Sequence, residues 1–210
     1  MLSIKRRDGD TLIEVLFAIA VFSFVVVASL ALMNQGTAAS QRALEVTLVR
    51  QQIDAQAETL RFMHDSYVSI YQSGISFNMT DNQTSPAEEW AKMVESIRTS
   101  NVQSASDFSV GITCPNPPTG SFIIDPRNVK FIPPSQLDGL SSAQNYSKVT
   151  YDSHGVFLAG EGIWIEAIRS ASSSNNTGFI DFHIRACWDS LGQTIPMSVG
   201  TIVRLYEPRG

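Results

Sequence analysis

The chain has 210 residues, of which 15 are Lys or Arg and 20 are Asp or Glu, so its formal net charge at pH 7 is −5. This acidic balance disfavours a protein that binds nucleic acid through an overall basic surface. Only 17% of the residues are charged, which excludes a charge-rich disordered tail and a coiled-coil rod. The mean hydropathy of +0.01 is typical of a soluble protein, but much of the strong hydrophobicity lies in one segment near the N-terminus.

That segment, residues 15–33, reads VLFAIAVFSFVVVASLALM and contains no charged residue. It is long enough to span a bilayer as a helix. Three basic residues precede it at positions 5–7, and the next basic residue is Arg42, so the positive-inside rule leaves the N-terminus in the cytoplasm and the rest of the chain outside. A cleaved secretory signal is the alternative. It fits less well because Glu14 adjoins the apolar run and no clear A-x-A exit follows.

Beyond the apolar segment, residues 38–62 contain no proline and carry apolar residues at helical spacing. These positions are Leu44, Leu48, Val49, Ile53, Ala57 and Leu60. We therefore expect one long helix from Thr11 to about His64, with its second half packed on a head domain. Gly36 is the expected site of a bend, because Gly costs about 1 kcal/mol in a helix interior.

The head contains one clear helix signal. Ser85 is suited to an N-cap, Pro86 to the first helical position and Glu88 to the return bond of a capping box. We expect a short helix over residues 86–99. Its apolar face indicates packing rather than ligand binding.

After this helix the hydrophobic period changes to two, which predicts strands. The expected strands are residues 121–125, 162–169, 178–188 and 200–206. Along residues 178–188, the side chains of Phe179, Asp181, His183, Arg185 and Cys187 share one face. An antiparallel sheet with its other face against the long helix explains this alternation, so the expected fold class is α+β.

Catalytic and metal-binding patterns are weak. His64, His154 and His183 lie in unlike contexts, and a His183/Cys187 metal pair would need two further ligands. The sequence has no G-x-S-x-G, G-x-G-x-x-G or P-loop motif. We expect no enzymatic activity, no cofactor and no metal.

Residues 5–19, KRRDGDTLIEVLFAI, resemble the class III signal of type IV pilins and pseudopilins: a short basic leader, a Gly at the cleavage site and an apolar helix. The resemblance implies the type IV pilin fold. It also implies that a prepilin peptidase cuts on the cytoplasmic face, with Gly9 as the last leader residue and Asp10 as the first mature residue. In the family the new N-terminus is methylated.

Two features differ from the major subunits of that family. Asp10 stands where a large apolar residue is usual, and no proline occurs before Pro86. Both differences favour a minor pilin or pseudopilin, and the start is most similar to minor subunits of the V or I type.

Glu14 occupies the fifth mature position, where the family's glutamate pairs with the N-terminal ammonium of a neighbouring subunit. A carboxylate at the centre of a membrane helix costs about 2.5–3.5 kcal/mol on insertion scales, and less near the interface, so a partner is expected. The alternative is an interfacial glutamate that reaches the water around the lipid headgroups.

The chain has two cysteines, Cys114 and Cys187. Both fall in the part placed outside the cytoplasm, where thiols oxidise, and we expect a disulfide between them. Many pilin heads have a similar C-terminal disulfide loop, from which we carry over a stabilising role only. The alternative is two separate buried thiols.

The expected organisation is a leader (1–9), a transmembrane helix (10–35), the amphipathic half of that helix (36–66) and a globular head (67–210). The resemblance implies a subunit of a pilus or secretion pseudopilus, located first in the inner membrane as a single-pass protein with its head outside. Its partners would be other pilin subunits, the prepilin peptidase, and the inner-membrane assembly platform with its ATPase. The alternative function is a membrane-anchored extracytoplasmic protein that binds a ligand or acts as an enzyme.

Overall fold

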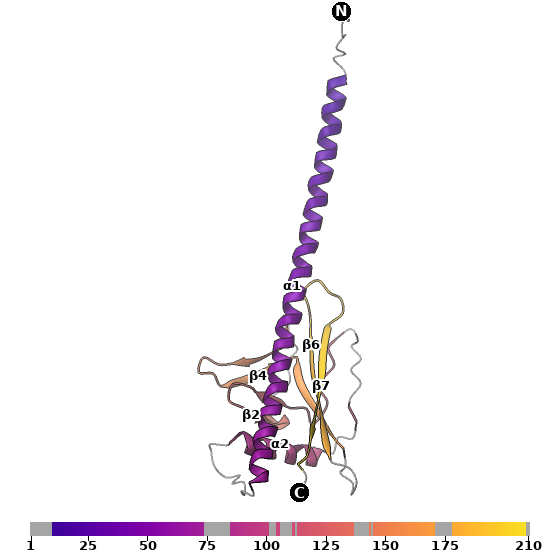
Figure 1. Cartoon of the computed structure of the whole chain (residues 1–210). Coiled ribbons are helices and arrows are strands. Elements are labelled where there is room, and N and C mark those ends of the chain that lie inside the picture. The colour runs from indigo at the N-terminus through magenta and orange to yellow at the C-terminus, as the bar shows by residue number, and fades with distance from the viewer. Residues whose placement is uncertain are drawn as a thin grey trace, which may run out of the picture. The chain divides into compact units, whose positions relative to one another are not determined.

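The computed structural model describes residues 10–73, 85–100, 104–105, 111, 113–136, 143, 145–170 and 178–208. Its first and longest element is helix α1, Asp10–Gln72 (Figure 1). The chain divides into two compact units, residues 1–43 and 44–210, so that α1 contributes to both. The arrangement agrees with the expected α+β class, since antiparallel strands follow the helix in the second unit.

Helix α1 is longer than the sequence indicated. It remains helical through Gly36, so this glycine does not interrupt it, and it ends at Gln72 rather than near His64. Residues 67–72, which were expected at the start of the head, form the C-terminal end of α1.

In the second unit, one stripe of α1 is buried in the core. Val49, Ile53, Ala57 and Leu60 are at most 4% exposed, as the helical spacing predicted. The prediction was wrong for Leu44, which is 59% exposed. At about 100° per residue, Leu44 lies on a different side of the helix from the stripe that runs through Val49 and Ile53.

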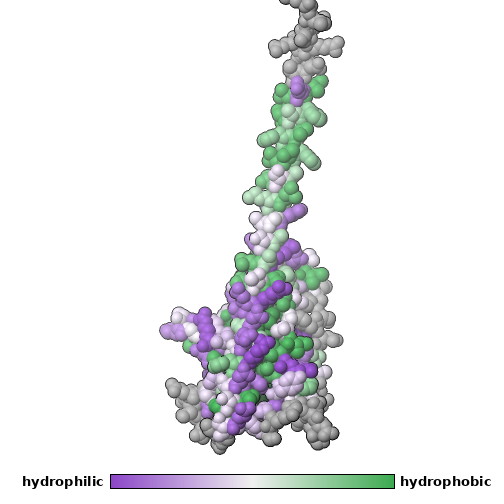
Figure 2. Space-filling view, in the orientation of Figure 1, coloured by the Kyte–Doolittle hydropathy of each residue, from purple (hydrophilic) through white to green (hydrophobic). Residues whose placement is uncertain are grey.

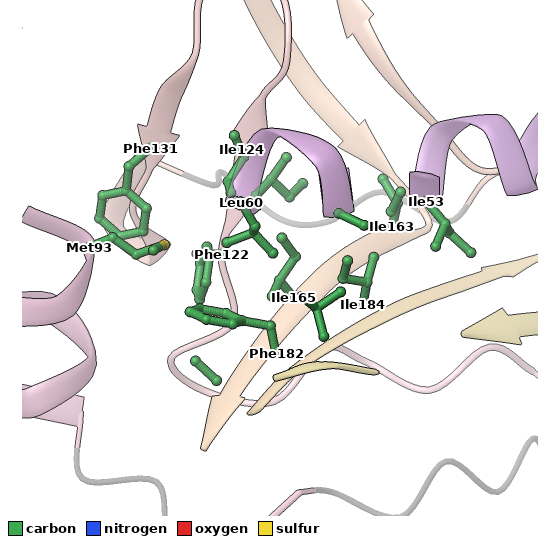
Figure 3. Close-up of a cluster of buried hydrophobic side chains, with 14 of the residues drawn as sticks. Ile53, Leu60, Met93, Phe122, Ile124, Phe131, Ile163, Ile165, Phe182 and Ile184 are labelled. Carbon is green, nitrogen blue, oxygen red and sulfur yellow. The ribbon is translucent and has the colours of Figure 1, made fainter. Parts of the chain in front are cut away.

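The main sheet consists of β5 (Ile163–Arg169), β6 (Phe179–Trp188) and β7 (Met197–Tyr206), paired antiparallel in that order. Ile165 pairs with Ile184 in this register. Alternate side chains of β5 and β6 form an inner face that is packed with residues of α1 and α2, as Figure 3 shows for ten labelled members of the core. The labelled side chains are Ile53, Leu60, Met93, Phe122, Ile124, Phe131, Ile163, Ile165, Phe182 and Ile184.

Four shorter strands extend the head. β1 (Ile123–Asp125) pairs with β2 (Lys130–Ile132), and a bridge between Phe122 and Ile165 joins this hairpin to β5. β3 (Lys148–Tyr151) pairs with β4 (Phe157–Glu161). The region of β1 was predicted from the sequence, whereas β2, β3 and β4 were not.

Helix α2, Pro86–Ser100, begins with the expected capping box. The Glu88 backbone N–H donates to Ser85 Oγ over 3.3 Å, and the Ser85 backbone N–H donates to Glu88 Oε2 over 2.7 Å. The adjacent Glu89 is buried and accepts a bond of 2.8 Å from the backbone N–H of Phe131. This contact fixes α2 against the β1–β2 hairpin.

Candidate functional site

The most distinctive surface of the chain is the N-terminal part of α1, whose visible face is apolar in Figure 2. Exposed apolar residues at successive positions from Leu12 to Met33 extend this surface around the helix. Phe17 and Phe22 are each 70% exposed, and Phe24 is 76% exposed. A helix that is hydrophobic on every side needs lipid or other helices around it. By length and composition, this helix could cross a membrane.

The two serines within the apolar run do not present free hydroxyl donors. Ser23 Oγ donates to the Ile19 carbonyl and Ser29 Oγ donates to the Val25 carbonyl, each over 2.8 Å. Such bonds to the preceding turn are usual for serines in helices. Because both donors are satisfied within α1, the run can be surrounded by hydrocarbon without an unpaired hydroxyl.

Glu14 is the acidic residue of this surface. Its side chain is exposed on α1. The neighbouring apolar residues Ile13 and Phe17 are exposed as well, each by 70%. Within the described part of the chain, the Glu14 carboxylate makes no hydrogen bond or ion pair. The predicted cleavage position Gly9 lies outside the described residues, and Asp10 is the first residue of α1.

The disulfide expected in the head is present. Cys114 is bonded to Cys187, with the two Cα atoms 5.7 Å apart. Cys187 lies at the end of β6 and is fully buried, so the bond fixes the segment around Cys114 to the outer face of the main sheet. Cys187 is thereby unavailable to a metal, which removes the His183/Cys187 pair as a ligand set.

A buried polar cluster occupies the outer face beside this disulfide. Glu166 Oε1 accepts from the Trp164 indole N–H over 3.0 Å and lies 3.3 Å from Arg185 Nε. All three side chains are at most 6% exposed. Burial lowers the pKa of the neighbouring His183, and Arg185 lowers it further. The cluster is a paired set of charges, which indicates a structural role.

The other histidines lie apart from this cluster. His64 Nε2 is 2.8 Å from the Tyr206 carbonyl oxygen, and its Nδ1 is 3.2 Å from Asp65. His154 lies in the exposed turn between β3 and β4. Among the residues that the structure describes, no group of three or more His, Cys, Asp or Glu side chains is placed to hold a metal ion.

The head contains a cavity of about 320 Å³ that no sequence pattern had indicated. Residues from α1, α2, β6, β7 and the segment after β7 line it, and we call it the aromatic cavity. Its lining includes Tyr67, Tyr71, Trp90, Val94, Arg98 and Glu207. In the sequence, these residues lie in ordinary amphipathic helices and at the ends of strands. They come close together only in the folded head, so the sequence does not reveal the cavity.

Comparison with protein-family models, with curated proteins and with solved structures gave no match. The resemblance of residues 5–19 to a prepilin signal therefore rests on those residues themselves.

Proposed function

We propose that this chain is a minor type IV pilin or a pseudopilin, cleaved after Gly9 and incorporated through α1 into a filament. The proposal rests on three features that follow one another at the N-terminus. A basic leader and the sequence TLIE lead directly into a helix that is apolar on all sides. An ordinary membrane anchor needs the apolar run but neither a glycine nor a glutamate at these positions.

Each part of this segment would have a role in assembly. Before assembly, the apolar run of α1 holds the subunit in the inner membrane with its head outside. In the filament, the same apolar surface packs against the helices of other subunits. The Glu14 carboxylate then pairs with the ammonium of Asp10 on a neighbouring subunit, which removes the cost of an isolated charge among apolar side chains.

The partners follow from this proposal. A prepilin peptidase removes residues 1–9, and an inner-membrane platform with its ATPase drives incorporation. Other pilin subunits contact the exposed apolar residues of α1. The disulfide between Cys114 and Cys187 stabilises the head in an oxidising compartment.

A second candidate is a membrane-anchored protein whose head binds a ligand, with α1 serving only as an anchor. The aromatic cavity favours it, since cavities of about 300–1,000 Å³ are typical of small-molecule sites. The two candidates differ in whether the leader is removed.

Mass spectrometry of the chain produced with and without a prepilin peptidase tests the proposal. We expect a mass decrease equal to residues 1–9, only when the peptidase is present. Gly9→Val should block the cleavage, whereas Gly36→Val, which has open space around the added side chain, should be cleaved normally. An unchanged mass in the presence of active peptidase would contradict the proposed function and favour the anchor.

A further inference from the structure

The aromatic cavity lies in the part of the head where the end of α1 meets α2 and the end of the main sheet. Tyr67 and Tyr71 contribute from consecutive turns of α1, and Trp90 contributes from α2. Ile180 and Leu205 contribute from β6 and β7. Because most of its described lining residues belong to regular elements, the cavity is preformed in this structure.

Its walls offer flat aromatic surfaces. The rings of Tyr67 and Tyr71 are 6.0 Å apart between centroids and inclined by 31°. Tyr71 is 40% exposed, so part of its ring remains accessible. Trp90 is only 4% exposed, and its ring centroid lies 5.0 Å from that of His64 and 5.7 Å from that of Phe182. Faces of aromatic rings carry partial negative charge, which attracts the weakly positive C–H groups of a ligand.

The charged groups of the cavity are already paired within the protein. Glu207 Oε1 accepts from Arg169 Nε over 2.8 Å and lies 2.6 Å from its Nη2. Arg98 Nη1 lies 3.9 Å from Glu95 Oε2. An ionic ligand would have to compete with the close, partly buried Arg169–Glu207 pair. A neutral ligand with several hydroxyl groups leaves that pair intact and can bind the exposed Arg98 and Glu95, whose own contact is long.

Tyr67 adds a neutral hydroxyl to this set. Burial raises the pKa of Tyr67, and the nearby Tyr71 raises it further. Because the pKa is raised from an already high ordinary value, Tyr67 adds no charge to the cavity at neutral pH.

We propose that the aromatic cavity binds one pyranose ring of a neutral saccharide. A pyranose presents a face of C–H groups to the tyrosine rings and a rim of hydroxyls to Arg98 and Glu95. This combination of an apolar face and a polar edge matches the cavity better than a purely apolar or an ionic molecule does. The inference goes beyond the proposed function and does not depend on cleavage of the leader.

The test uses the full chain in lipid nanodiscs prepared without glycoside detergents. The probes are the methyl pyranosides of glucose, galactose, mannose and N-acetylglucosamine, with choline chloride and inorganic phosphate as ionic comparisons. The ¹H–¹⁵N resonance of the Trp90 indole, assigned with Trp90→Phe, reports binding. The indoles of the fully buried Trp164 and Trp188, which do not line the cavity, serve as internal references. We expect at least one pyranoside to shift only the Trp90 resonance, with a Kd of about 1 mM.

Variants show whether the aromatic cavity is responsible. Tyr71→Ala should weaken binding by about 5-fold because it removes a stacking surface, and Tyr71→Phe should retain most of the affinity. The matched control is Phe62→Ala, since Phe62 is a 53% exposed aromatic residue of α1 outside the cavity. The proposal is overturned if no pyranoside shifts Trp90, if choline or phosphate does so instead, or if Tyr71→Ala leaves the affinity unchanged.

Discussion

Gln56 on α1 binds both backbone polar groups of Ile124 on β1. Its Nε2 donates to the Ile124 carbonyl over 2.7 Å, and its Oε1 accepts from the Ile124 N–H over 3.0 Å. Gln56 is 1% exposed. Inside the core, its side-chain amide makes the two hydrogen bonds that the backbone of a neighbouring strand would otherwise make with Ile124. It satisfies a carbonyl and an amide of β1 that would otherwise be buried without partners.

Gln56→Leu should therefore destabilise the head more than an ordinary surface change. Removing the amide leaves both groups of Ile124 unsatisfied, which costs about 1–3 kcal/mol for each group. Chemical denaturation of the head, followed by near-UV circular dichroism, measures the loss. Gln51→Leu is the matched control, because Gln51 is exposed on the same helix. Equal stabilities of the two variants would show that the Ile124 contact contributes little.

Replacing both cysteines by alanine should lower the free energy of unfolding by up to about 4 kcal/mol, because the bond closes a loop of 73 residues. Thermal unfolding of the oxidised protein and of the Cys114→Ala/Cys187→Ala variant gives the difference. Alkylation under denaturing conditions should label no cysteine before reduction and two afterwards. Two labelled cysteines without reduction would contradict the bond.

Glu14→Gln should leave cleavage and membrane insertion intact but remove the subunit from sheared filaments. The substitution keeps the shape of the side chain and removes the charge that pairs with the neighbouring ammonium. Immunoblotting of membrane and filament fractions separates the two steps. Glu58→Gln, an exposed glutamate on the second half of α1, should be incorporated normally. Normal incorporation of Glu14→Gln would rule out the assembly role.

His183 should make the head less stable as the pH falls below about 6.5. Burial lowers the pKa of His183 in the folded protein, so the unfolded chain binds a proton at higher pH than the folded chain does. The contribution of His183 is thus fully present above pH 6.5, its ordinary pKa, and is lost as the pH falls toward the lowered value. Midpoints of chemical denaturation at about pH 7.5 and about pH 5.5 measure the effect. These two values lie on either side of the ordinary histidine pKa of about 6.5. In His183→Gln the difference between the two pH values should shrink, and an unchanged difference would assign it to other groups.

The strands that could be predicted are those with long alternating patterns. β5 and β6 show the alternation along seven and ten residues, because one face of the sheet is packed in the core. For β7 the prediction covered residues 200–206, whereas the strand begins at Met197. β2 has only three residues, and β3 and β4 are largely half-exposed, so their sequences carry little alternation. The capping box at Ser85 was predictable because its bonds are local in sequence.

Long-range polar contacts could not be predicted. In the sequence, Gln56 resembles a residue of the polar face of α1. Only the position of β1 in the fold makes it a buried hydrogen-bond partner of Ile124. In the same way, Tyr71 and Arg98 become parts of one cavity only after α1, α2 and β7 have been brought together. The exposed apolar run was predictable, since it depends on composition alone.

The contacts of α1 with β6 and β7 also determine the order in which the head can mature during synthesis. Trp188 Nε1 donates to Glu45 Oε2 across 143 positions, and His64 meets the Tyr206 carbonyl across 142 positions. These two contacts of α1 consequently form only after the ribosome has made β6 and β7, long after the helix itself has emerged. Folding dominated by such distant pairs is slow, and it leaves apolar surface open to aggregation. The head can therefore complete its core only when its last strand has been made.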